Sequence, residues 1–199
     1  MANVFALHAL ADGIARYLDR AYPAAMRAVH SASFEAINTG QLMRERAQGA
    51  GNLVTIWPYR VLVNEHQRNR EFALRPGRIN RPLPLDVHLL LTVWADNAGD
   101  EMLLFAWAMR ELYRLPVLDR SVLTTVDAGL RADEVIQLAP AEMSVEDMMR
   151  IWEAVTPSYR LSAPFVARVL QLDIEEDEAR NVVAQRLRFT DEVPTEVAP

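Results

Sequence analysis

The chain has 199 residues, of which 51% are hydrophobic and 24% are charged, and it contains no Cys. This length suits one domain with a sizeable apolar core, and these proportions exclude a disordered chain, a disulfide scaffold, thiol chemistry and Cys-ligated metals. All 21 basic residues are Arg, the formal net charge is −6, and no apolar run is long enough to span a bilayer, so we expect neither a nucleic-acid binder nor a membrane protein.

The first quarter of the chain predicts a helix and then a strand. Apolar residues at helical spacing predict a helix over residues 3–21, and a short β-type run follows at 33–38. Residues 53–64 are rich in β-branched and aromatic side chains, which predicts the first long strand. Pro58 lies inside this strand and cannot donate a ladder hydrogen bond, so we expect a sheet edge or a bulge there.

Residues 65–84 are predicted to form a long loop, because Pro76-Gly77 and Pro82-x-Pro84 block regular structure. A loop of this length is usually either functional or mobile. It could be a solvated connection, a site that docks acidic protein surfaces through bidentate Arg–carboxylate pairs, or a site for nucleic-acid phosphates. The acidity of the whole chain weighs against a site for nucleic-acid phosphates. The segment has a local charge of +3, from two Glu and five Arg: Arg68, Arg70, Arg75, Arg78 and Arg81.

The middle and end of the chain alternate between strands and helices. A buried strand is expected over 85–96, a helix over 100–115, a short strand over 134–138, a helix over 144–155 that Ser144 and Asp147 begin, and a half-buried strand over 159–172. The helix over 100–115 is apolar on all sides near its middle. We therefore expect it to be buried on more than one side, in the core or against a neighbouring subunit.

The composition changes at residue 174. Residues 174–199 hold seven acids and three Arg, a net charge of −4. We expect a domain over 1–173 and an acidic C-terminal extension over 174–199 that is partly disordered, in which 182–189 pair as a strand or lie on a neighbour. The predicted fold is a single α+β domain, with a mixed and mostly antiparallel sheet flanked by helices. The N-terminus lacks a signal peptide, so we expect assembly in the cytoplasm.

One enzymatic alternative follows from the acids and histidines of the two central strands. Glu65, His66, Asp86 and His88 would converge if those strands pair, as in a small metal-dependent hydrolase. Such spacings are common by chance, and the chain has no His pair at helical spacing, nucleophile elbow, Walker motif or dinucleotide motif. We therefore assign no catalytic, cofactor-binding or metal-ligating residue and expect no enzyme.

A set of ordered segments runs across residues 1–173: MANVFALH at 1–8, YRVLVNEH at 59–66, RNR at 68–70, LPLDVHLLLTVWAD at 83–96, AWAMR at 106–110, PVLD at 116–119, SVEDMMRIW at 144–152 and PSYRLS at 157–162. In this order, the segments resemble the N-terminal domain of the cap, or tail-terminator, proteins of extracellular contractile injection systems. The Photorhabdus virulence cassette and the Serratia antifeeding prophage are the known types of such systems. Pro58 departs from the pattern.

The resemblance implies a structural role and an α+β fold related to contractile phage-tail terminators. Family members form a hexameric ring that stops the inner tube and contacts the last sheath layer, and they have no catalytic residues. The implied partners are copies of this chain, the sheath protein and the inner tube protein, in a particle that is assembled in the cytoplasm and then either released or kept in the cell. We expect no larger C-terminal domain and hence no membrane anchoring through one. A non-ring adaptor of a phage-like tail or baseplate is the alternative.

We expect the interface with sheath, tube or neighbouring subunits to combine the Arg-rich segment, two aromatic residues of the strand over 53–64 and two Arg of the C-terminal extension. These residues are Arg68, Arg70, Arg75, Arg78, Arg81, Trp57, Tyr59, Arg186 and Arg188.

Overall fold

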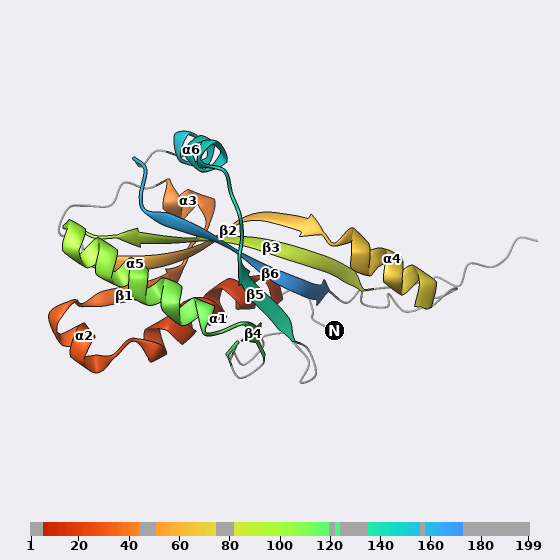
Figure 1. Ribbon diagram of the computed structural model, residues 1–199, viewed down its shortest axis with the longest axis horizontal. Coiled ribbons are helices and arrows are strands. Elements are labelled where there is room, and N and C mark those ends of the chain that lie inside the picture. The colour runs from red at the N-terminus through yellow and green to blue at the C-terminus, as the bar shows by residue number, and fades with distance from the viewer. Residues whose placement is uncertain are drawn as a thin grey trace, which may run out of the picture.

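One six-stranded mixed sheet organises the protein in the computed structural model (Figure 1). The helices are α1 (Ala6–Ala21), α2 (Ala24–Val29), α3 (Thr39–Leu42), α4 (Glu65–Leu74), α5 (Ala98–Tyr113) and α6 (Val145–Glu153). The strands are β1 (Ala32–Ala36), β2 (Asn52–Val63), β3 (Leu83–Trp94), β4 (Val117–Leu118), β5 (Ile136–Pro140) and β6 (Ser162–Leu172). The structure describes residues 6–43, 51–74, 82–119, 122–123, 135–155 and 158–172, with the side chains of 70–74 left out.

The strand order is β1-β2-β3-β6-β5-β4, in which β1 and β2 are parallel and every other pair is antiparallel. The last described strand, β6, therefore lies inside the sheet between β3 and β5. The strands β2 and β3 are paired from Leu53 opposite Trp94 to Val63 opposite Leu85. The predicted α+β class with a mixed, mostly antiparallel sheet is confirmed.

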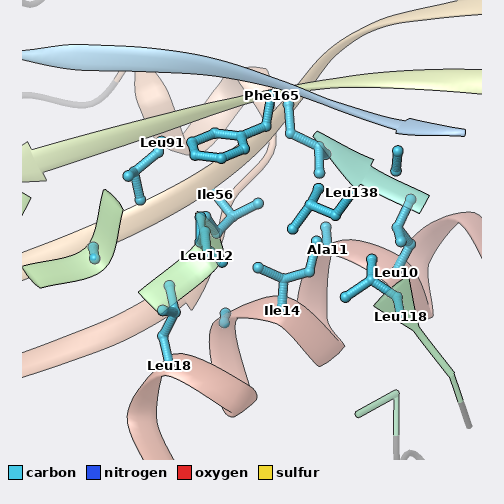
Figure 2. Packing of buried hydrophobic residues seen from close by; sticks show 14 of the residues in the cluster. Leu10, Ala11, Ile14, Leu18, Ile56, Leu91, Leu112, Leu118, Leu138 and Phe165 are labelled. Carbon is cyan, nitrogen blue, oxygen red and sulfur yellow. The ribbon is translucent and has the colours of Figure 1, made fainter. Parts of the chain in front are cut away.

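The larger core lies between one face of the sheet and helices α1 and α5 (Figures 1 and 2). Leu10, Ile14 and Leu18 recur along α1 and are buried against Ile56 and Phe165 of the sheet. Figure 2 shows these side chains pointing toward one another from the helix and the strands. Burying such side chains contributes about 1.5–3 kcal/mol each and fixes which faces of the helices meet the sheet.

A smaller core covers only one end of the opposite face. There α3 and α6 pack over Trp57, Leu90 and Trp94, and the ring centroids of Trp94 and Trp152 are 6.1 Å apart. The predicted cap of α6 is present, since Ser144 Oγ accepts from the Asp147 backbone N–H at 3.0 Å. The remaining half of this face, toward the ends of β2 and β6, has no described helix over it (Figure 1).

A polar network ties the first third of the chain to the start of α5. One carboxylate oxygen of Asp100 lies 2.6 Å from His30 Nδ1, and the other accepts from Asn97 Nδ2 at 3.0 Å and Asn52 Nδ2 at 3.1 Å. These hydrogen bonds, first from Asn97 and then from Asn52 and His30, hold the pKa of Asp100 below its usual range. His30 follows α2 directly and joins this network.

One expectation from the sequence is wrong, and a second is only partly tested. The segment 65–84 is not one loop, because α4 occupies Glu65–Leu74 and β3 begins at Leu83 in spite of Pro84. Within the single chain, the apolar helix α5 is buried on one side only, where Trp107 and Leu112 pack, while Met102 is 66% exposed. The helix is therefore not surrounded by the core, and its burial against a neighbouring subunit stays a prediction. The elements α2, α3 and β4 were not predicted. None of the helices within the described ranges has the length and apolar character needed to cross a membrane.

Candidate interaction surface

The hairpin formed by β2 and β3 extends away from the helices and carries α4 beyond the end of β2 (Figure 1). Asn64 holds this arrangement together. Its side-chain Oδ1 accepts from the Gln67 backbone N–H at 3.0 Å, which caps the first turn of α4. Its Nδ2 donates to both carboxylate oxygens of Asp86, at 3.2 and 3.0 Å, and its backbone N–H donates to the Pro84 carbonyl at 2.9 Å. The start of α4 is thereby fixed to β3.

Side chains from three strands meet on the half of the sheet that α3 and α6 leave uncovered. We call this region the open sheet face and define it by residues on β2, β3 and β6 that share one side of the sheet. In register, Arg60 lies opposite His88, Leu62 lies opposite Asp86, and the Arg168 guanidinium reaches Asp86 from β6. A bulge between Pro58 and Arg60 lets Tyr59 lie over His88, with ring centroids 5.9 Å apart. The open sheet face consists of Tyr59, Arg60, Leu62, Asp86, His88 and Arg168.

The open sheet face is basic although the whole chain is acidic. Arg60 is exposed, and Arg168 is 56% exposed with its Nε 3.9 Å from Asp86 Oδ2. Burial lowers the pKa of His88, and Arg60 lowers it further, so this ring is neutral at pH 7. Burial raises the pKa of Tyr59. Two exposed guanidinium groups thus stand against one carboxylate that Asn64 already holds, which favours an acidic partner.

The structure places the predicted interface residues at different depths. Trp57 is 9% exposed and packs in the smaller core, with Tyr59 half-buried beside it at a ring distance of 6.1 Å. Arg68 is exposed on α4, and Arg70 lies two residues further along the same helix. The others lie outside the described residues: Arg75, Arg78, Arg81, Arg186 and Arg188.

The residues of the enzymatic alternative do not form a metal site. Within the ranges that the structure describes, which include Glu65, His66, Asp86 and His88, no three His, Cys, Asp or Glu side chains are grouped so that they could hold a metal ion. A cavity of about 320 Å³ lies between α1 and the end of β1. His8 is the one titratable side chain among its described lining residues, so the cavity offers no acid–base pair.

Sequence reasoning missed Arg60, Asn64 and Arg168. Two signals in the sequence indicated the helix α4 and its cap. Asn64 and Gln67 stand at capping spacing, and α4 is rich in good helix formers. No local signal brings Arg168 onto the same sheet face as Arg60, because this depends on β6 pairing with β3.

Two solved structures are among those that are similar to this chain. The sheath/tube terminator of the PVC extracellular contractile injection system, in its extended state, is 15% identical with a TM-score of 0.45, over 91% of this chain and 64% of that chain. The anti-feeding prophage tube-terminating cap is 13% identical with a TM-score of 0.42, over 74% of this chain and 52% of that chain. This chain therefore spans less than two thirds of either.

No curated protein matches the chain. The family model of the Pvc16 N-terminal domain matches residues 8–185, which is most of the sequence and extends beyond the last described strand. The protein therefore belongs to the Pvc16 N-terminal domain family.

Proposed function

We propose that this protein is the terminator that caps a contractile injection tail, where six copies form a ring that ends the inner tube and binds the last layer of the sheath. The match of the family model over residues 8–185 carries this proposal. The role requires binding surfaces rather than reactive groups, which suits a chain whose described residues offer a basic face and a projecting hairpin.

The geometry of the hairpin supports a docking role for the Arg-rich segment. The Asn64 side chain fixes the start of α4 to β3, so Arg68 on α4 is presented beyond the edge of the helical layers. A rigid base limits the conformational entropy lost on binding. We place the contact with sheath or tube on the segment from Arg68 to Arg81, because Arg pairs with carboxylates in a bidentate manner.

Charge reversal tests this contact. Arg70→Glu combined with Arg78→Glu should leave the thermal midpoint of unfolding unchanged and lower the fraction of particles that carry a cap in electron micrographs. Arg150→Glu is the matched control, since Arg150 is exposed on α6 and pairs with the exposed Glu146 one turn away. Unchanged capping by the double variant, or an equal loss in the control, would refute the assignment.

Counting copies tests the ring. Native mass spectrometry of caps released from particles should give six copies of the chain. One or two copies at the end of each particle would instead identify a non-ring adaptor. A chain that binds neither tube nor sheath would refute the terminator role altogether.

A further inference from the structure

Among the described strands, none pairs with the outer edge of β2 over its second half. The strand β1 pairs with β2 only from Asn52 to Ile56, and no described strand pairs with that side of β2 beyond this point. Figure 1 shows the end of β2 at the border of the sheet, with β3 on its inner side. Val61 and Val63 are 42% and 43% exposed there. Exposed strand edges of this kind are templates for pairing with another chain, and native proteins usually protect them.

The side chains around this edge specify the chemistry of an added strand. Main-chain hydrogen bonds to residues 59–63 would supply affinity without regard to side chains. On the open sheet face, Arg60 lies on β2 itself and Arg168 lies two strands away on β6. Arg60 has no acidic partner among the described residues. A strand with carboxylates would therefore be selected over one with basic groups.

This chain contains one segment of that chemistry. Five of the six residues in 173–178, DIEEDE, are acids, and the segment follows β6 directly. The alternative strand candidate at 182–189 carries Arg186 and Arg188, which Arg60 would repel. We propose that the free edge of β2, residues 59–63, binds the acidic segment 173–178 of a neighbouring copy as an added strand.

The distance that the segment would have to cross favours a neighbouring copy over the same chain. Both β2 and β6 run antiparallel to β3, so they point the same way, and β6 ends at Leu172 opposite Leu83. To reach the free edge, the chain would cross three strand spacings, about 14 Å, which uses four or more residues. Too few of the six would then remain to pair. A segment from the next subunit is free of this limit.

This inference rests on the proposed ring, because a head-to-tail contact that repeats between identical subunits closes into a ring when its rotation permits. The absence of Cys from the chain allows a direct test with single-Cys variants. Leu62→Cys is placed on the edge of β2, and Glu176→Cys in the acidic segment. Val145→Cys, on an exposed site of α6, is the matched control. All three purified full-length variants are first shown to unfold at the parent temperature.

Mixing the Leu62→Cys and Glu176→Cys chains under oxidising conditions should give a disulfide-linked heterodimer on a non-reducing gel, at least tenfold faster than mixing the Val145→Cys and Glu176→Cys chains. Adding Arg60→Glu to the Leu62→Cys chain should slow the link severalfold. The proposal is overturned if the control pair links at the same rate or if no link forms at all. It is also overturned if the Leu62→Cys/Glu176→Cys double variant forms an intramolecular link at high dilution. This assay needs no tube or sheath, so the cross-link can fail to form while capping succeeds, and capping can fail while the cross-link forms.

Discussion

Asn64 is predicted to hold α4 in place through two separable interactions. Asn64→Ala removes the cap on the Gln67 backbone N–H, which costs about 1 kcal/mol, as caps of this kind do. It also removes both hydrogen bonds to Asp86, which we value at about 1 kcal/mol, below the usual range for a charged acceptor, because water reaches that carboxylate. The free energy of unfolding should therefore fall by about 2 kcal/mol. Asn64→Ser keeps a capping oxygen and loses only the bonds to Asp86, so its loss should be about 1 kcal/mol.

Urea unfolding followed by Trp fluorescence measures both losses, and amide hydrogen exchange separates them. The Gln67 amide should exchange faster in Asn64→Ala than in Asn64→Ser, because only the serine variant still accepts its hydrogen bond. The same two variants should differ in the fraction of capped particles, since the orientation of α4 sets where Arg68 lies. Equal unfolding free energies and equal Gln67 exchange in the two variants would refute the capping role of Asn64.

Two further predictions concern the core and its polar links. Gly13→Ala should lower the free energy of unfolding in a urea titration. A Cβ at residue 13 would lie 2.4 Å from Leu123 Cδ2 and 3.0 Å from Leu123 Cα. The resulting overpacking costs about 1–3 kcal/mol, which exceeds the gain in helix propensity of about 1 kcal/mol. The depressed pKa of Asp100 means that its carboxylate stabilises the fold above the ordinary carboxyl pKa and that this stability is lost as the pH falls through the folded-state value. Asp100→Asn should therefore flatten the dependence of the melting temperature on pH below about pH 4, and an unchanged profile would contradict the assignment.

Patterns that repeat within one element could be predicted from the sequence. Apolar spacing located α1 and the long strands, and Pro58 correctly indicated irregularity in β2, where both an edge that no described strand pairs with and a bulge occur. The helix α4 was missed because Pro and Gly further along the segment suggested a loop throughout. The capping pair of Asn64 and Gln67 was the local signal that should have outweighed them, since it acts at the helix start and not at its end.

The open sheet face could not be predicted because it depends on pairing between distant strands. Arg168 shares a sheet face with Arg60 only because β6 inserts between β3 and β5, and strand order of this kind depends on long-range packing that no local window contains. The link between His30 and Asp100 is similar, since it joins the end of α2 to the start of α5. The family resemblance indicated the function class from the sequence, but not which residues lie at the surface.

Electron microscopy of particle length tests the central claim most directly. Particles assembled in cells that lack this protein should have inner tubes of variable length and sheaths without a closed distal end. Supplying the intact chain should restore one length and a sixfold cap. Particles of normal length with an intact distal end in the absence of this protein would contradict the terminator role.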